Sequence, residues 1–145
     1  EKVLIGGEES GGYGFRGHVP ERDGILAGLC FLDLMIKTGK TPSELLDYLY
    51  SKVGPHHFKR IDFNFPEDER QAINNRIKHS LPKSIDGTDV VKTDTTDGFH
   101  FILANTSWLL IRFSGTEPVL RIYAESDSLA RAEKLIELGK ELAGV

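Results

Sequence analysis

The sequence predicts an α+β protein, because strand-like and helix-like segments form separate groups along the chain. Four runs of alternating apolar and polar residues are joined by short, turn-rich segments, which predicts a four-stranded antiparallel sheet. Amphipathic helix patterns flank this group and are expected to cover one face of the sheet. The predicted strands span 89–94, 98–104, 107–113 and 119–125, and the predicted helices span 66–81 and 127–144.

The chain before this sheet is predicted to be a partial α/β domain of one strand, a long loop and two helices. A short buried strand is expected over 2–6, and residues 7–24 form a glycine-rich loop without helical or strand periodicity. Asp23 is the expected N-cap of a buried apolar helix over 25–36 that ends near Gly39.

A second helix in this part of the chain is predicted from its starting residues. Thr41 is the expected N-cap, and Glu44 follows it by three positions, as in a capping box. The extended, mixed stretch between Pro55 and Pro66 then predicts a boundary between two units. The predicted units are residues 1–60 and 61–145.

The composition limits the classes of function. A net charge of −4 and a pI of about 5.7 argue against binding of nucleic-acid backbones. No run approaches the ~20 apolar residues of a membrane helix, so no membrane partner is expected. The single cysteine, Cys30, excludes an internal disulfide, is expected to be a buried apolar residue, and favours a cytoplasmic location.

The segment RFSGTEPVLR, from Arg112 to Arg121, places anion-binding groups around one turn between two predicted strands. Alternation puts both arginines on the sheet face opposite the apolar residues, next to the loop. Arginine suits phosphate oxygens, Ser114 and Thr116 add hydroxyl donors, and Gly115 lets backbone N–H groups approach an anion. Taken alone, the pattern also fits a polar hairpin turn with two exposed arginines.

The longer segment RFSGTEPVLRIYAE resembles the C-terminal phosphate-binding loop of the α-D-phosphohexomutase superfamily, which includes phosphoglucomutases and phosphomannomutases. The family pattern is Arg-x-Ser-Gly-Thr-Glu-Pro followed by a second Arg, and every element is present. Glu117 would by itself repel a phosphate, but it belongs to the motif and is expected to support the loop. The resemblance implies that the phosphate is held by Arg112, Ser114, Gly115, Thr116 and Arg121.

The opening segment GEESGG resembles the sugar-binding loop of the same superfamily, whose core is Gly-Glu-x-Ser-Gly. Carboxylates and hydroxyls on a backbone that bends closely around a ring suit vicinal sugar hydroxyls. The resemblance implies that Glu8 and Ser10 bind the hydroxyls at C3 and C4 of a hexose, while Glu9 receives no assigned contact. Gly12 stands where phosphomannomutase-type and glucosamine-type members often carry histidine, which favours a glucose phosphate.

The segment HVPERDG resembles the stretch after the sugar loop in phosphoglucomutases, where a basic residue faces the active site. Arg22 matches that position, and His18 is expected nearby as a further sugar-binding candidate. The alternative for both is a surface position in the loop. The adjacent pair His56 and His57 is expected to be solvated.

The resemblance covers nearly the whole chain but only the last portion of the family architecture. Residues 1–60 correspond to the C-terminal part of the third, sugar-binding-loop domain, and residues 61–145 to the fourth, phosphate-binding domain. The family's Ser-His-Asn-Pro phosphoserine motif and Asp-x-Asp-x-Asp magnesium loop do not occur in these 145 residues. We therefore expect a fragment with no catalytic residue and no metal ligand of its own, inactive by itself.

The full-length parent is expected to be an isomerase that interconverts hexose 1-phosphate and hexose 6-phosphate, most readily of glucose. The resemblance implies Mg²⁺, a hexose 1,6-bisphosphate activator and intermediate, and a phosphoserine outside this chain. The expected partners are a small-molecule phosphosugar and the remaining domains of the parent. Alternatives are a non-catalytic sugar-phosphate-binding module, a phosphomannomutase or phosphoglucosamine mutase, and a nucleic-acid-binding sheet, which the acidic balance opposes.

Overall fold

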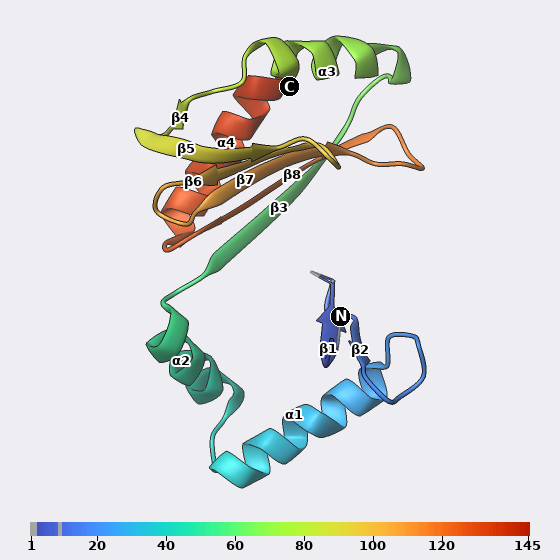
Figure 1. Cartoon of the computed structure of the whole chain (residues 1–145), viewed down its shortest axis with the longest axis vertical. Helices are drawn as coiled ribbons and strands as arrows, with labels where there is room; N and C mark the ends of the chain where they lie inside the picture. The colour runs from blue at the N-terminus through green and yellow to red at the C-terminus, as the bar shows by residue number, and fades with distance from the viewer. Residues whose placement is uncertain (1–2, 9) are drawn as a thin grey trace. The chain divides into compact units, whose positions relative to one another are not determined.

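The structure is a computed structural model that describes residues 3–8 and 10–145, and the chain forms two compact units (Figure 1). Unit 1 comprises Glu1–Lys52 and unit 2 comprises Val53–Val145. No described helix combines the length and the apolar character that a bilayer crossing requires.

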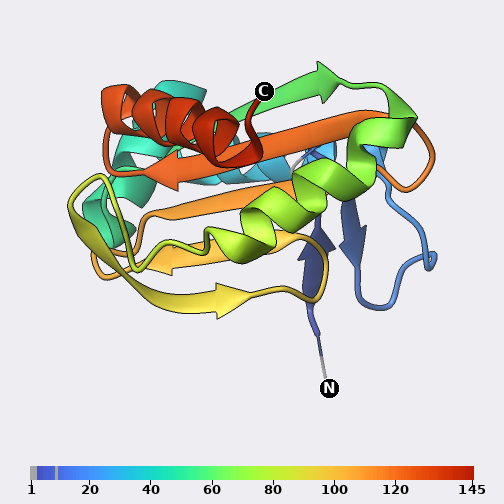
Figure 2. The same cartoon turned by 90° about the horizontal axis from the view of Figure 1, so that it is seen from above.

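Unit 2 is built on an antiparallel sheet of six strands in the order β3-β8-β7-β6-β5-β4. Helices α3 and α4 both cover the same face of this sheet (Figure 2). We call the opposite face the open face. The elements are β3 His57–Asn64, a 3₁₀ turn Glu67–Glu69, α3 Arg70–His79, β4 Ser84–Ile85, β5 Thr88–Asp94, β6 Phe99–Leu103, β7 Trp108–Phe113, β8 Val119–Ser126 and α4 Leu129–Ala143.

The four predicted strands are confirmed as β5 to β8, but the prediction of a four-stranded sheet was wrong by two strands. The stretch read as an extended connection is strand β3, which pairs along its whole length with β8, from His57 opposite Ser126 to Asn64 opposite Val119. The second addition is the two-residue strand β4, joined to β5 by a tight turn through Asp86 and Gly87, both with positive φ.

The core of unit 2 lies between the sheet and the two helices. The alternation predicted for β7 and β8 is confirmed, because their inward residues, such as Leu109 and Ile122, are wholly buried. On α4 the predicted apolar face is buried at Ala132, Leu135, Ile136 and Ala143, whereas Leu142 is partly buried and Leu129 is 46% exposed. The core comprises Phe65, Ile73, Ile77, Ile85, Phe99, Phe101, Leu103, Leu109, Ile111, Leu120, Ile122, Ala124, Leu135, Ile136 and Ala143.

Unit 1 consists of a small hairpin followed by two helices. Strands β1 Ile5–Gly7 and β2 Tyr13–Phe15 pair antiparallel, and helices α1 Gly24–Thr38 and α2 Pro42–Val53 follow them. The expected strand over 2–6 therefore begins later than predicted, with Lys2 outside the described residues. Strand β2 was not predicted, because glycine on both sides of Tyr13 hides the alternation.

The predicted caps of both helices in unit 1 are confirmed. The Asp23 side chain accepts a hydrogen bond from the Leu26 N–H, and Gly39 closes α1 in the left-handed conformation with φ of 66°. The Thr41 hydroxyl accepts from the Glu44 N–H, and the Glu44 carboxylate accepts from the Thr41 N–H at 2.8 Å, which is a capping box.

The predicted burial of α1 was wrong. None of its side chains is buried in the described chain, and Cys30, expected inside, is exposed. In α2 an apolar stripe of Leu45, Leu46, Leu49 and Val53 was expected to be buried. Only Leu45 is buried, and the other three side chains are exposed. The helices of unit 1 therefore form where the sequence predicts them, but their apolar surfaces are not covered within the described residues.

Candidate functional site

Two arginines lie directly opposite each other at the end of the β7–β8 hairpin. Arg112 and Arg121 are cross-strand partners in the sheet register, so both side chains leave from the open face. Their side chains are 34% and 25% exposed. Like charges in directly opposed positions of a sheet destabilise it, so this pair favours an anion between or above the two guanidinium groups.

Carboxylates surround this arginine pair on three sides. Asp97 lies 3.3 Å from Arg112, Asp62 lies 3.7 Å from Arg121, and Glu117 lies 3.9 Å from Arg121. The two contacts of Arg121 are longer than a hydrogen bond, and the Nε atoms of both arginines are buried without a hydrogen-bond partner among the described residues. Both side chains nevertheless stay partly exposed, so the pair can present guanidinium N–H donors to an anionic ligand.

Asp62 is fixed by a second arginine on the same strand. The Arg60 guanidinium donates to both Asp62 oxygens, at 2.8 Å each. These hydrogen bonds hold the pKa of Asp62 below its usual value, with a smaller contribution from the charge of Arg121. Asp62 is therefore a carboxylate at neutral pH and can orient Arg121 electrostatically.

The loop between the two arginines has an anchored start and an open middle. The Ser114 N–H donates to the Val119 carbonyl at 2.8 Å, and the buried Ser114 hydroxyl accepts from the Thr116 N–H at 3.4 Å. A Cβ added at Gly115 would meet no atom within 4 Å. The loop backbone therefore stays accessible at Gly115, while Ser114 holds the turn together.

Arg70, at the start of α3, contacts this loop from outside the motif. Its guanidinium lies over the rings of Phe65 and Phe113, 5.6 and 5.0 Å from their centroids. It also donates to Glu67 at 2.6 Å and to the Ser114 carbonyl at 3.3 Å. Sequence reasoning missed Arg70, because its position 44 residues before the loop carries no local signal.

A polar hollow of about 360 Å³ borders the same region. It lies between α3 and the β5–β6 turn, and it includes Asp97, which pairs with Arg112, and Phe113, which precedes the loop. Gly98 in this turn has a φ of 102°, and a Cβ there would lie 2.7 Å from the Arg112 Cβ. The absence of a side chain at Gly98 therefore leaves room for the Cβ of Arg112.

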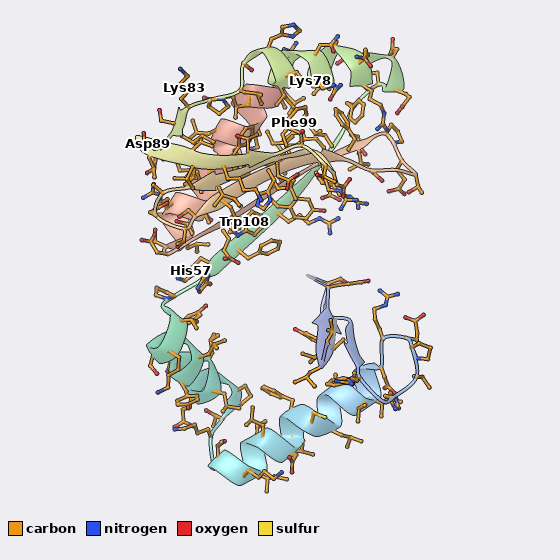
Figure 3. The ribbon with its side chains drawn as sticks, in the orientation of Figure 1. His57, Lys78, Lys83, Asp89, Phe99 and Trp108 are labelled. Carbon is orange, nitrogen blue, oxygen red and sulfur yellow. The ribbon has the colours of Figure 1, made fainter. Side chains whose placement is uncertain are left out.

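Several aromatic rings also lie on the open face. Trp108 contacts Phe58 and the edge of His100, with ring centroids 6.2 and 5.5 Å apart, and its indole N–H donates to Glu125. Figure 3 shows Trp108 on this face and Phe99 on the helix-covered side. Partial burial lowers the pKa of His100, so this ring is neutral at pH 7 and packs against Trp108 on the open face.

In unit 1, the loop between β1 and β2 brings together three of the four predicted sugar-binding residues. The Arg22 guanidinium donates to the Glu8 carboxylate at 2.6 Å, and the Ser10 hydroxyl donates to the same carboxylate at 3.1 Å. The loop is closed by the Glu8 N–H, which donates to the Gly12 carbonyl at 2.9 Å. The hydrogen bonds that Arg22 donates to Glu8 and, second, to Glu21 raise the pKa of Arg22. Glu9 lies outside the described residues.

His18 is the predicted site residue that does not join this cluster. Its Nε2 pairs with Asp23 at 2.7 Å, and Asp23 in turn accepts from the Leu26 N–H at the start of α1. These contacts, led by the Leu26 N–H, lower the pKa of Asp23. The geometry therefore places His18 at the helix start rather than beside Glu8.

His56 is exposed, as predicted. Its Nδ1 pairs with Glu125 at 2.9 Å, at the beginning of unit 2. No group of three or more His, Cys, Asp or Glu residues among those described could hold a metal ion, so the residues present do not fit a magnesium site.

Comparison with known proteins agrees with this geometry. The family "Phosphoglucomutase/phosphomannomutase, C-terminal domain" matches residues 63–138, and "Phosphoglucomutase/phosphomannomutase, alpha/beta/alpha domain III" matches residues 1–53. The chain belongs to the phosphoglucomutase/phosphomannomutase family. The arginine pair, its loop and the Glu8 cluster all lie within segments that match this family.

Relatives in this family cover nearly all of the chain. A protein of Thermococcus kodakarensis named phosphoglucomutase/phosphomannomutase is 36% identical over 95% of the chain and 28% of its own length. One of Sulfurisphaera tokodaii named phosphoglucosamine/phosphogalactosamine mutase is 32% identical over 99% of the chain and 30% of its own length. The chain thus spans less than a third of each relative.

A solved structure supports the fold. A phosphoglucomutase/phosphomannomutase family protein from Burkholderia thailandensis superposes with a TM-score of 0.68 at 20% identity, over 98% of this chain and 29% of that one. At this identity the likeness concerns the fold alone.

Proposed function

We propose that the protein carrying this chain is a phosphohexomutase that interconverts hexose 1-phosphate and hexose 6-phosphate. The observation that carries the proposal is the directly opposed pair Arg112 and Arg121, two partly exposed cations that face each other across the β7–β8 hairpin. Two guanidinium groups beside an open glycine backbone suit a dianionic phosphate ester. Membership of the phosphoglucomutase/phosphomannomutase family supports the same class of substrate.

In this proposal unit 2 binds the phosphate that is not transferred. Arg112 and Arg121 supply charge-assisted donors, Gly115 supplies a backbone N–H group, and Thr116 supplies its hydroxyl. The Ser114 hydroxyl accepts from the Thr116 N–H and can donate its own proton. Glu117 supports Arg121 and does not contact the anion. Binding is electrostatic positioning, which is the main contribution of protein groups to phosphoryl transfer.

Unit 1 supplies the hydroxyl-binding groups for the same hexose phosphate. Glu8 and Ser10 bind vicinal hydroxyls, and Arg22 orients the Glu8 carboxylate. The 2.6 Å hydrogen bond between Arg22 and Glu8 supports this assignment, since it holds the acceptor oxygens in place. His18 belongs to the helix start and has no direct contact with sugar in this proposal.

The transfer chemistry lies outside this chain. A phosphoserine would donate to the sugar and regain phosphate from a hexose 1,6-bisphosphate intermediate, and Mg²⁺ would be bound by other parts of the parent. The described residues include no group that could hold a metal ion, so they have no part in binding the Mg²⁺. The partners in this proposal are a phosphosugar and the remaining domains of the parent, and the location is cytoplasmic.

The exposed apolar surface of unit 1 supports a partnership with further domains. Ile25 and Ile36 at the two ends of α1 are 81% and 72% exposed. Exposed apolar surface of this extent on one helix marks a surface that another element covers. We propose that other parts of the parent chain cover it.

The choice of hexose has two candidates. Glucose is the first, because Gly12 stands where glucosamine-type members often carry histidine. An aminohexose phosphate is the second, because relatives named phosphoglucosamine mutase, such as one from Methanococcus maripaludis, are 32% identical.

The phosphate role is tested by Arg121→Ala in the full-length parent enzyme. Loss of charge-assisted hydrogen bonds to a dianion, at ~1.5–3 kcal/mol, should raise KM for glucose 1-phosphate about tenfold to a hundredfold. Lys92→Ala is the control, because it removes one positive charge from the same sheet face at the opposite end of the strands. An unchanged KM in the Arg121 variant would count against the phosphate site.

A further inference from the structure

Gly12 provides the space in which Arg22 reaches Glu8. A Cβ built on Gly12 would lie 2.4 Å from the Arg22 Cδ and 3.2 Å from its Cγ. Gly12 is not among the glycines with positive φ, so its backbone conformation is open to any residue. What glycine contributes here is therefore room for the Arg22 side chain, and a side chain at position 12 would push Arg22 aside.

Arg22 in this space binds one particular oxygen of Glu8. Among the described residues, the hydrogen bonds from Arg22 at 2.6 Å and from Ser10 at 3.1 Å both end on Oε2. The other oxygen, Oε1, keeps its lone pairs for a ligand. Arg22 is itself held by Glu21, which accepts from both its backbone N–H at 2.8 Å and its Nε at 3.3 Å.

We propose that Gly12 and Arg22 together make the sugar loop select neutral hexose phosphates against aminohexose phosphates. The proposal rests on the proposed function, because it concerns the sugar that Glu8 binds. Gly12 lets Arg22 stay on Glu8, and the guanidinium charge compensates that of the carboxylate. A sugar hydroxyl can still donate to Oε1, because this hydrogen bond needs an acceptor but no net charge.

An ammonium group beside the Glu8 carboxylate is affected by the charge of Arg22, whereas a neutral hydroxyl is not. The amino group of an aminohexose is a cation at neutral pH, on the carbon next to the hydroxyls assigned to Glu8 and Ser10. Arg22 both repels this cation and removes the net negative charge that would attract it. Displacing Arg22 leaves Glu8 as an uncompensated carboxylate, which favours the amino sugar.

The test is a double-mutant cycle in the full-length parent enzyme. We expect Gly12→Ala to raise the kcat/KM ratio of glucosamine phosphate to glucose phosphate about two- to fivefold, the size of one exposed charge pair. Arg22→Ala should shift the ratio in the same direction. Because Gly12→Ala acts through Arg22, the double variant should show the ratio of Arg22→Ala alone.

Gly14→Ala is the matched control, since Gly14 lies in the same hairpin and a Cβ there would meet only the Glu21 carbonyl oxygen at an ordinary 3.6 Å. Its ratio should equal that of the wild type. An unchanged ratio in Gly12→Ala, or fully additive effects in the double variant, overturns the inference. A crystal structure of Gly12→Ala that still shows Arg22 on Glu8 overturns it as well.

Failure of the proposed function has a separate signature. If the wild-type parent turns over neither sugar phosphate, the assignment of a mutase fails, and the inference about selectivity fails with it. If the wild type is active and the variants keep its substrate ratio, the mutase assignment stands and only the role of Gly12 and Arg22 is rejected.

Discussion

Charged residues of both signs surround the proposed phosphate loop of unit 2, residues 112–121. Four arginines and four carboxylates lie near this loop, which makes the cluster formally neutral: Arg60, Arg70, Arg112, Arg121, Asp62, Glu67, Asp97 and Glu117. A phosphate must therefore compete with carboxylates that already face the guanidinium groups. This competition makes each acidic residue a determinant of affinity.

Removing one competitor should strengthen phosphate binding. Asp97→Asn takes away the carboxylate 3.3 Å from Arg112, and it should tighten binding of glucose 1-phosphate about two- to fivefold, the range of an exposed ion pair. Calorimetric titration at low salt measures the change, and Asp89→Asn, on the exposed outer part of β5, is the control. Weaker binding by the Asp97 variant would mean that Asp97 orients Arg112 and does not compete with the ligand.

A glycine in α4 sets the packing of that helix on the sheet. A Cβ added at Gly139 would lie 2.7 Å from the Ile122 Cγ2 and 3.1 Å from the Leu109 Cδ1. Alanine is intrinsically better than glycine in a helix by ~1 kcal/mol, but overpacking a core costs ~1–3 kcal/mol. We therefore expect Gly139→Ala to lower the unfolding free energy of unit 2 by about 1 kcal/mol.

Urea denaturation followed by Trp108 fluorescence reports the stability of unit 2 for this variant. Glu141→Ala, at an exposed position of the same helix, should change the unfolding free energy by less than ~0.5 kcal/mol. A Gly139→Ala variant that is more stable than the wild type would show that α4 moves outward without loss of packing.

The elements differ in how well the sequence predicted them. Strands β5 to β8 were predicted from alternating runs that are separated by turn-rich segments. Strand β3 escaped, because Phe58 lies on the open face while Ile61 and Phe63 pack toward the core, so aromatic residues occur on both faces. Its pairing with β8 also places Asp62 opposite Arg121, a site contact that no local pattern could reveal.

The start of β3 also carries a pH-dependent contact. The hydrogen bond to Glu125 raises the pKa of His56, so protonated His56 stabilises the folded chain below the unfolded value of about 6.5. This stabilisation is lost as the pH rises through the folded pKa. Between pH 6 and pH 8 the wild type should therefore lose stability relative to His56→Gln, measured as the difference in Tm.

The same comparison has an internal check. Glu125→Gln removes the acceptor and should flatten the pH dependence in the same way, although it also alters the contact of Trp108. Parallel curves for the wild type and His56→Gln across this pH range would show that the 2.9 Å contact contributes no charge-dependent stability.

At the scale of the whole molecule, the sequence predicted which residues of the candidate phosphate loop lie together, but it did not predict which apolar surfaces are buried. The phosphate-loop residues are neighbours in the chain, so a single hairpin brings them together, and family membership follows from the same segment. The predicted burial of α1 and Cys30 was wrong. An apolar helix sequence indicates that another element should pack against the helix, but it does not show that this element lies in the same chain segment. Arg70 and Asp62 reach the loop only through tertiary packing.

The proposal assigns substrate binding to this chain and phosphate transfer to other domains of the parent, which gives a prediction for the 145-residue chain itself. It should show no mutase turnover in a coupled assay with glucose 1-phosphate and glucose 1,6-bisphosphate, because it lacks the phosphoserine motif. It should still bind the sugar phosphate, and Arg112→Ala should weaken that binding. Turnover by the purified chain would refute the assignment of the transfer step to other domains.

The strand order has a consequence for how the protein is synthesised. Strand β3 is the first strand of unit 2 to leave the ribosome, yet its partner β8 is the last strand of this unit. Until residues beyond Val119 emerge, β3 has no native neighbour, and non-local pairing of this kind is slow. A nascent chain stalled before β8 should therefore expose an unpaired strand to chaperones, and both arginines enter their final register only after β8 has emerged.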